Sequence, residues 1–352
     1  MKDNKLSDLL KLSRRVGERF DLVQAGGGNT SVKNEDGTMY VKASGLRLSD
    51  LKSEESFVLI DNRKLQSLFH DINWEEISKR DREKIASEIV NQSNLTPDRR
   101  PSIETLLHSS LDGYILHCHP VSVTSYFSNK DSEDHVSKHC PDYAFVSYET
   151  PGIELALALQ RSQEKYYKEF SRYPNGFVFQ NHGLLTFAKT WEESFVETIR
   201  FNRLVSEIIG FPFATFDLSN IISDVMENIT GESWLTLASG ESEFNQISIN
   251  KRAFFPDAVV FLGVAILELD QAEFSYIENQ VKTFIAKHSV MPKVFKFKNT
   301  LYFLGKTFSK VKEVEEVWKL HHIASQYEPD SLSYEEIDYL CHWEAEKFRQ
   351  KN

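Results

Sequence analysis

The chain has 352 residues with 41% hydrophobic and 26% charged side chains, a composition typical of packed globular proteins and too apolar for a disordered one. At roughly 100–200 residues per domain, this length predicts about two domains. The net charge of −11 disfavours nucleic acid and anionic membranes as partners, because both are normally met by a basic surface.

Cysteine usage and hydropathy point to the cytoplasm. The three cysteines, Cys118, Cys140 and Cys341, are an odd number without C-x-x-C spacing, which predicts a reducing compartment. The first residues carry scattered charges, and the longest apolar run, Ala258 to Leu267, has only ten residues. We therefore expect no signal peptide and no membrane span.

The N-terminal part predicts a helix followed by a hairpin. Leucines at helical spacing favour a helix from Leu6 to Phe20, ahead of the glycine turn Gly26-Gly27-Gly28. Two short β-like runs, Asn29–Val32 and Met39–Lys42, flank an Asp-Gly turn, and a second turn, Ala43-Ser44-Gly45, follows them.

The middle of the first half predicts a helix and a buried strand. Residues 73–90 are charge-rich without a sharp period and indicate exposed helix or loop. Ser102 is placed to cap the next helix, with Glu104 in its first turn. Residues Tyr114–His119 form a bulky run typical of a buried strand, and Pro120 ends it.

Strands and helices alternate up to about residue 210. We expect two helices, over Ile153–Phe170 and Trp191–Ile209. We expect two strands between them, over Gly176–Gln180 and Leu184–Phe187, separated by Asn181-His182-Gly183. This order predicts a layered α/β domain over residues 1–210 and a second, smaller α/β domain over residues 211–352.

The second half repeats the strand-then-helix order of the first. Its expected elements are two strands and a helix, over Ala258–Leu262, Val294–Leu304 and Lys312–Ala324. When Lys189-Thr190 is aligned with Lys306-Thr307, His182 falls on Asn299, and nothing in the second half resembles His117-Cys118-His119. The pattern fits either a degenerate duplication without a metal site or convergent patterning.

Three histidines have the spacing of a metal site. His117 and His119 are two residues apart on a strand, so both imidazoles lie on one face. His182 lies between a strand and a glycine, where the chain can present a third imidazole, and Glu104 is a candidate fourth group. Three nitrogens with an open position favour Zn²⁺, although Mn²⁺, Co²⁺ and Fe²⁺ also fit. The alternative is that local hydrogen bonds satisfy these histidines.

Two turns and a helix start are candidates for anion binding. The exposed N–H groups and hydroxyls of Gly26–Thr30 and Lys42–Gly45, together with Ser102 at a helix N-terminus, suit a phosphate. Neither turn has the order of a Walker loop or of a G-x-G-x-x-G dinucleotide site. The candidate phosphate-binding residues are Gly28, Asn29, Thr30, Lys42, Ser44, Gly45 and Ser102.

The order of the motifs carries a family resemblance over residues 5–210. The motifs are Gly28–Ser31, Ser44-Gly45, Ser102–Glu104, His117–His119 and Asn181–Gly183. Together they resemble the class II aldolase and adducin-type family of sugar-phosphate aldolases, epimerases and dehydratases. Gly26–Lys33 and Arg100–His108 are most similar to the aldolase part of two-domain rhamnulose-phosphate aldolase/dehydrogenase proteins, without a dinucleotide-binding dehydrogenase half.

The resemblance implies a class II, metal-dependent aldehyde-lyase that reversibly cleaves a ketose 1-phosphate to dihydroxyacetone phosphate and an aldehyde. In such a site His117, His119 and His182 hold the metal, and Glu104 ligates it or acts as the catalytic acid/base. Proton transfer by Glu104 then requires a pKa raised from about 4.3 towards neutrality. The alternatives are a sugar-phosphate epimerase or dehydratase with the same metal, and a non-catalytic adducin-like binding protein. Family members also imply a homo-oligomer.

Three features depart from the family pattern. Ile103 stands where several simpler members have a second serine, which removes one phosphate hydroxyl. Glu104 and His117 are thirteen residues apart, a shorter spacing than in the simple sugar-phosphate aldolases. No motif identifies the group that deprotonates the aldol hydroxyl among Tyr126, Tyr143 and Tyr148.

Overall fold

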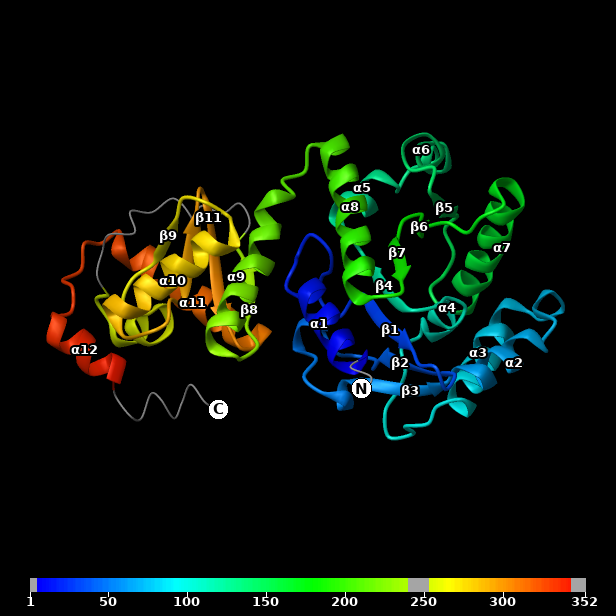
Figure 1. Cartoon of the computed structure of the whole chain (residues 1–352), viewed down its shortest axis with the longest axis horizontal. Helices are drawn as coiled ribbons and strands as arrows, with labels where there is room; N and C mark the ends of the chain where they lie inside the picture. The colour runs from blue at the N-terminus through cyan, green and yellow to red at the C-terminus, as the bar shows by residue number, and fades with distance from the viewer. Residues whose placement is uncertain (1–4, 240–252, 343–352) are drawn as a thin grey trace. The chain divides into compact units, whose positions relative to one another are not determined.

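The computed structural model describes residues 5–239 and 253–342 and divides the chain into two compact units. The first unit runs to Gly17 and continues over Asp21–Phe213, and the second holds Glu18–Phe20 and the chain from Ala214 onward. Each unit has its own sheet (Figure 1). No helix among the described residues is long and apolar enough to cross a membrane.

A seven-stranded sheet forms the middle of the first unit, in the order β3-β2-β1-β4-β7-β6-β5. Its strands are β1 (Asn29–Lys33), β2 (Thr38–Lys42), β3 (Phe57–Asp61), β4 (Tyr114–Cys118), β5 (Tyr143–Val146), β6 (Gly176–Phe179) and β7 (Gly183–Ala188). Neighbouring strands are antiparallel except β5 and β6, which are parallel. The Asp-Gly turn joins β1 and β2 in the predicted hairpin, with Val32 opposite Tyr40.

Helices cover both faces of this sheet. Successive residues of a strand point to opposite faces, so Leu116 of β4 packs in one core and Ile115 in the other. The first face carries α1 (Lys5–Gly17), α5 (Val121–Tyr126), α6 (Ser132–His139) and α8 (Trp191–Ile209). The second face carries α2 (Asn62–His70), α3 (Lys79–Gln92), α4 (Thr105–Ser109) and α7 (Ile153–Phe170). The expected layered α/β fold is confirmed, with the sheet between two layers of helices.

Helix ends in the first unit follow local capping chemistry. The predicted bounds of α7 and α8 are those of the structure. The Thr190 hydroxyl accepts a hydrogen bond from the Glu193 N–H, and the Glu193 carboxylate accepts one from the Thr190 N–H, which fixes where α8 begins. The end of α1 was predicted wrongly: the helix stops at Gly17, because residues 18–20 belong to the second unit.

The helix predicted after Ser102 is shorter than expected. α4 has five residues, and Glu104 precedes its first turn without making a side-chain cap. The Ser102 hydroxyl instead accepts a hydrogen bond from the Glu104 N–H at 3.2 Å. Ser102 therefore closes a turn ahead of the helix rather than capping the helix itself.

The second unit is a smaller α/β unit with a four-stranded sheet in the order β8-β11-β10-β9. Its strands are β8 (Leu235–Ala238), β9 (Leu267–Leu269), β10 (Val294–Phe297) and β11 (Thr300–Gly305). Its helices are α9 (Ala214–Thr230), α10 (Phe274–His288), α11 (Phe308–Ser325) and α12 (Tyr334–His342). α9 and α10 pack on the face that carries Tyr302, and α11 packs on the face that carries Phe303.

Two strand predictions in this unit are wrong. Ala258–Leu262 is a π-helical turn that shares a core with Trp318 of α11. A short apolar run buried on most sides has no period that separates helix from strand, so the sequence pattern could not decide. Val294–Leu304 is a hairpin of two strands, β10 and β11, and the chain reverses at Lys298, whose φ is 53°.

The second sheet has the topology of half of the first. The orders β4-β7-β6-β5 and β8-β11-β10-β9 carry the same pair directions, antiparallel, antiparallel and parallel. A threonine caps the helix that follows each hairpin, Thr190 in one unit and Thr307 in the other. The shared order supports the duplication hypothesis, which stays a prediction.

The same comparison shows which residues of the second unit stand at the positions of His182 and His117. The loop between β6 and β7 holds residues 180–182, including His182, whereas the loop between β10 and β11 holds only residues 298–299. Under the alignment of Lys189 with Lys306, Leu185 falls on Tyr302, and their strand partners are His117 and Ala238 respectively. At the positions of His182 and His117 the second unit therefore has Asn299 and Ala238, neither of which carries an imidazole.

Glu18 ties the N-terminal segment into the second unit. Its buried carboxylate accepts hydrogen bonds from the Asn220 amide, the Ser223 hydroxyl and the Thr236 N–H of β8. Glu18→Ala removes an acceptor that three buried donors share, although the Ser223 hydroxyl can still donate to the Thr236 hydroxyl, so we expect the free energy of unfolding to fall by about 2 kcal/mol. Chemical denaturation measures this change, with the exposed Glu55→Ala as control, and equal stability of the two variants would contradict it.

Candidate metal centre

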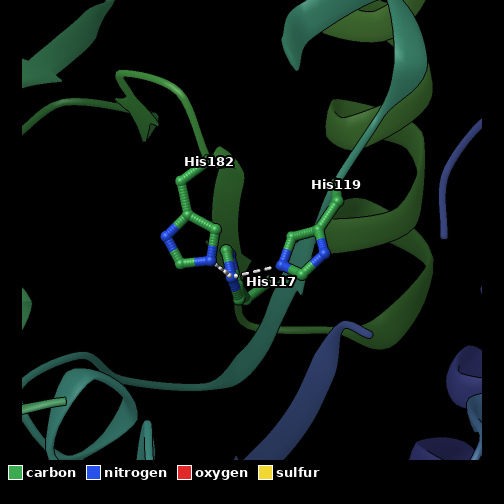
Figure 2. Close-up of side chains that lie close together, drawn as sticks. All are labelled: His117, His119 and His182. Carbon is green, nitrogen blue, oxygen red and sulfur yellow. Dashed lines mark hydrogen bonds between the residues drawn. The ribbon is translucent and has the colours of Figure 1, made fainter. Parts of the chain in front are cut away.

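Three imidazoles converge at one end of the first sheet, as Figure 2 shows. Nε2 of His117 lies 3.2 Å from Nε2 of His119 and 3.4 Å from Nε2 of His182. One ligand atom from each histidine lies within 4.8 Å of the others, and the described residues contain no second group of this kind. His117 is buried while His119 and His182 are partly exposed, so the cluster is open on one side.

Strand alternation brings His117 and His119 together. Cys118 between them points into the opposite core, as the period of two predicts. His119 follows the last residue of β4, and its N–H donates to the Leu22 carbonyl at 2.9 Å. The chain direction at His119 is therefore held although the strand has ended.

A tight turn aims His182 at the other two imidazoles. Asn181 adopts a left-handed conformation with φ 57°, and the His182 N–H donates to the Phe179 carbonyl at 3.2 Å. A Cβ at Gly183 would lie 2.2 Å from the carbonyl oxygen of Cys118. Glycine at this position lets β7 approach β4 closely enough for His182 to reach His117.

The glycine turn before β1 has a role that the sequence did not suggest. A Cβ at Gly27 would lie 2.9 Å from Nδ1 of His119, so the missing side chain makes room for the imidazole. Gly28, with φ 76°, turns the chain into β1, and a Cβ there would lie 3.1 Å from the His117 carbonyl oxygen. Both glycines fit closely around the histidines, and the anion-binding role expected for Gly28 stays a prediction.

Glu104 lies with the histidines as predicted. Its Oε1 is 3.5 Å from Nε2 of His117 and 3.4 Å from Nε2 of His182. Its Oε2 accepts a hydrogen bond from the Asn29 amide at 2.5 Å. The side chain is buried, so its carboxylate is directed at the cluster rather than at bulk water.

Burial and mutual charge set the protonation of the cluster. Burial lowers the pKa of His119 to about 3 and that of His182 to about 4, and the charge of His117 acts in the same direction. Burial also opposes the charged form of His117, but the charge and hydrogen bonding of Glu104 raise its pKa overall. Within the cluster the charged form is therefore favoured at His117 and disfavoured at His119 and His182.

Beside the metal-free imidazoles the pKa of Glu104 is lowered, whereas proton transfer at carbon requires a raised one in the working site. Burial alone would raise the pKa of this carboxyl, but the charge and hydrogen bond of His117, together with His182, hold it well below its usual range. The sequence shows the apolar neighbour Ile103 but not the imidazoles, and Ile103 is mostly exposed. Glu104 is ionised at neutral pH.

The donor set fits a divalent cation. Nδ1 of His117 lies 3.0 Å from the Leu184 carbonyl and donates to it, which leaves the Nε2 lone pair of the neutral ring facing the cluster. Zn–N bonds of about 2.0–2.1 Å at tetrahedral angles separate two nitrogens by about 3.3 Å. The Nε2 separations of 3.2 and 3.4 Å match this value. His117, His119 and His182 are suitable ligands, and Glu104 is a candidate fourth.

Some of the candidate anion-binding residues gather beside Glu104. Ser44 and Gly45 lie on an exposed turn, and the backbone just before it pairs with residues 100–101, next to Ser102. Because the Ser102 oxygen accepts from the Glu104 N–H, its own O–H is available to donate.

Lys42 and Thr30 differ in how they relate to this turn. Lys42 is buried, and its Nζ donates to the Leu46 carbonyl at 2.8 Å, so it braces the turn from inside. Burial lowers the pKa of Lys42, and the charge of Glu104 opposes this shift. Thr30 points to the other face of β1, where its hydroxyl lies 2.7 Å from the Ser13 hydroxyl, so the structure does not bring Thr30 to the site.

The three candidate tyrosines lie in different surroundings. Tyr143 is buried and donates to a glutamate of α8, and burial raises its pKa far above its usual range. Tyr126 stacks on a histidine of α6. Tyr148 is exposed, and its N–H donates to the Gln180 side chain at 3.2 Å, in the loop that carries His182.

Two polar residues beside the cluster had no role in the sequence interpretation. His108 is buried one helical turn after Glu104, and its Nδ1 lies 2.8 Å from the Ser31 hydroxyl. The i,i+4 spacing of Glu104 and His108 indicates a shared helix face. Ser31 is two residues after Asn29 and so lies on the same strand face, a signal that the sequence did contain.

Metal uptake near pH 7 is expected to release about one proton per chain. The lowered pKa values of His119, His182 and Glu104 leave these groups unprotonated, whereas His117, with a raised pKa, must lose its proton to ligate. Release should decrease as the pH is raised, since more His117 is then already neutral. Calorimetric Zn²⁺ titrations in buffers of different ionisation enthalpy measure the number, and two or more protons would contradict this account.

The chain is similar to known proteins over its first unit. Residues 7–208, more than half of its length, match the family model for the Class II Aldolase and Adducin N-terminal domain. No curated protein matches the chain. Among solved structures, it is similar to the N-terminal class II aldolase domain of a conserved protein from Thermoplasma acidophilum, with 25% identity, coverage of 59% of this chain and 95% of that one, and a TM-score of 0.49.

Two further solved structures show lower similarity. A sugar-phosphate aldolase from Thermotoga maritima has 13% identity, coverage of 57% of this chain and 91% of that one, and a TM-score of 0.39. An L-fuculose-1-phosphate aldolase from Thermus thermophilus has 14% identity, coverage of 58% and 93%, and a TM-score of 0.38.

Proposed function

Because the chain belongs to the class II aldolase and adducin family, we propose that it is a metal-dependent aldehyde-lyase. The proposed reaction is the reversible cleavage of a ketose 1-phosphate into dihydroxyacetone phosphate and an aldehyde. The observation that carries the proposal is that a buried carboxylate, Glu104, lies 3.5 and 3.4 Å from two of three convergent imidazole nitrogens.

Zn²⁺ is the proposed metal, held by His117, His119 and His182. When bound, it polarises the carbonyl and adjacent hydroxyl oxygens of the substrate and offsets the negative charge that develops as the carbon–carbon bond breaks. The buried position of His117 and its bond to the Leu184 carbonyl hold the ligand nitrogen in place.

Glu104 is the proposed catalytic residue for proton transfer at carbon. In the condensation direction its ionised carboxylate removes a proton from dihydroxyacetone phosphate, and in the cleavage direction the same carboxyl returns that proton to the carbon. The Asn29 amide binds Oε2, which leaves Oε1 on the side of the histidines to accept the proton.

The phosphate is proposed to lie against Ser44, Gly45 and Ser102. The turn is exposed, and the Ser102 O–H is a free donor beside it, so backbone amides and hydroxyls supply the local hydrogen bonds. These donors, with Lys42 behind the turn, act against the unfavourable field of a chain with net charge −11. Ile103 contributes no hydroxyl, so Ser102 is the one serine of its segment for this role.

The remaining expectations form part of the same proposal. The partner is a small sugar phosphate rather than nucleic acid or membrane, and the working form is a cytoplasmic homo-oligomer. Residues 211–352 take a regulatory or assembly role, since the described part of the second unit has no cluster of metal-ligating side chains.

Aldehyde release from a panel of phosphorylated ketoses tests the proposal. Protein loaded with Zn²⁺ should release an aldehyde and dihydroxyacetone phosphate, chelation should abolish the release, and added Zn²⁺ should restore it. Activity that survives full removal of metal would overturn the proposal. A product with inverted stereochemistry and no fragments would assign an epimerase, and loss of water alone would assign a dehydratase.

A further inference from the structure

One face of β1 makes three successive polar contacts with α4 and the residue before it. The Asn29 amide donates to Oε2 of Glu104 at 2.5 Å, the Ser31 hydroxyl lies 2.8 Å from Nδ1 of His108, and Nζ of Lys33 donates to the carbonyl of Ser109 at 2.5 Å. Residues 29, 31 and 33 share this face because strand side chains alternate. We call these contacts the β1–α4 polar row.

α4 depends on such contacts for its position. It has only five residues, and a helix this short is not stable by itself in water. Glu104 precedes its first turn with no side-chain cap, so nothing within the helix fixes where the carboxylate points. Packing of Leu106 and Leu107 into two different cores holds the helix against the sheet, and the Asn62 amide of α2 also donates to the Ser109 carbonyl at its end. Apolar contact is less directional than a hydrogen bond, so the polar contacts with β1 define the register at Glu104 more sharply.

His108 makes the middle contact of the polar row without taking part in the metal cluster. The side chain is fully buried, and the backbone N–H of His108 donates to the backbone carbonyl of Glu104 at 3.3 Å. Burial lowers the pKa of the imidazole to about 3, so the ring is neutral. Its Nε2 is buried and has no partner among the described residues. A leucine would fill this core position without leaving a ring nitrogen unsatisfied, so packing alone does not account for a histidine here.

We propose that Ser31 and His108 are positioning residues, whose hydrogen bond fixes α4 along β1 so that the Glu104 carboxylate lies against His117 and His182. This inference rests on the proposed function, since it explains how the proton-transfer group is held. Neither side chain makes a hydrogen bond to the three histidines of the cluster among the contacts of the described residues. Their effect passes through the backbone of one helical turn, from position 108 to position 104.

The first test compares Ser31→Ala, His108→Leu and His108→Asn with the wild type in the aldehyde-release assay. Asparagine places an amide atom where Nδ1 of the imidazole lies, so it can keep the bond to Ser31, whereas leucine cannot. We expect kcat to fall about 10- to 100-fold in Ser31→Ala and His108→Leu, with KM within about threefold and metal content unchanged. His108→Asn should recover most of the loss.

Ser13→Ala is the matched control. It removes the bond from Ser13 to Thr30, a buried hydroxyl pair of 2.7 Å on the opposite face of the same strand. We expect this variant to lose as much thermal stability as Ser31→Ala while keeping the wild-type kcat. If Ser13→Ala and Ser31→Ala slow the reaction equally, the effect is general loosening of β1 and the positioning role is overturned.

A measurement on metal-free protein separates this inference from the proposed function. The imidazole ¹⁵N shifts of His117 and His182, recorded at one pH, report whether the carboxylate still lies beside them. These shifts should change in Ser31→Ala and His108→Leu but not in Ser13→Ala. Changed shifts in a protein that cleaves no ketose phosphate would keep the positioning role and overturn the proposed function, and unchanged shifts together with unchanged kcat would overturn the positioning role.

Discussion

His119→Ala is expected to abolish stoichiometric metal binding and to lower aldehyde release by about a thousandfold or more. Its Nε2 is one of three nitrogens that converge within 4.8 Å, and two remaining imidazoles leave a Zn²⁺ site incomplete. Loss of a residue that only hydrogen-bonds to a metal ligand typically lowers the affinity for the metal by about 10- to 100-fold, so loss of a ligand itself should lower it further. Metal analysis after dialysis, followed by the aldehyde assay, measures both effects.

The control for this variant is His139→Ala, which removes an exposed histidine of α6. It should bind one metal per chain and keep the wild-type rate. The melting temperature of the metal-free His119→Ala protein should stay close to that of the metal-free wild type, which separates lost ligation from lost folding. If His119→Ala retained metal and activity, the three histidines would not be the catalytic metal site, and the metal would be bound elsewhere.

Glu104→Gln is expected to lower kcat by about 10²- to 10⁴-fold while the metal stays bound. Glutamine has the size of glutamate and can still accept the Asn29 hydrogen bond, but it has no carboxylate to take a proton from carbon. KM should change little, because the proposed phosphate contacts are made by Ser44, Gly45 and Ser102. Steady-state kinetics with metal analysis tests the split.

Glu197→Gln provides the same charge change elsewhere in the first unit. That carboxylate is half-buried and is bound by Tyr143 and Arg200, so the variant controls for the loss of a structural charge. It should keep kcat even if its stability falls. A wild-type rate in Glu104→Gln would show that another group moves the proton, with Tyr148 the next candidate to replace.

Much of the first unit could be predicted because its elements carry a clear period or cap. α7 and α8 have eighteen and nineteen residues, long enough for apolar spacing to define both ends. α4 has five residues, fewer than two turns, so its length depended on contacts with β1 that no local pattern shows. The π-helical turn Ala258–Leu262 failed for a related reason, since five apolar residues fit a strand equally well.

Features of the site that follow from the alternation of side chains along a strand could be predicted from the sequence. Features that depend on contacts between residues far apart in the sequence could not. His117 and His119 share a face by alternation alone, and the same rule, applied to β1, separates Asn29 from Thr30. The ionisation of Glu104 could not be predicted, because it depends on imidazoles that lie thirteen or more residues further along the chain and fold back to 3.4–3.5 Å.

The place of Glu18 bears on the synthesis of the chain. Its partner Asn220 lies 202 residues further on, and at about 5–20 residues per second that partner is made roughly 10–40 s later. Throughout this interval the segment 18–20 is in the nascent chain and exposed to water, because the part of the second unit that covers it has not been made. A carboxylate is well solvated in that state, so Glu18 adds no apolar surface to the nascent chain. An acid at this position therefore suits both the finished fold and the order in which its parts are synthesised.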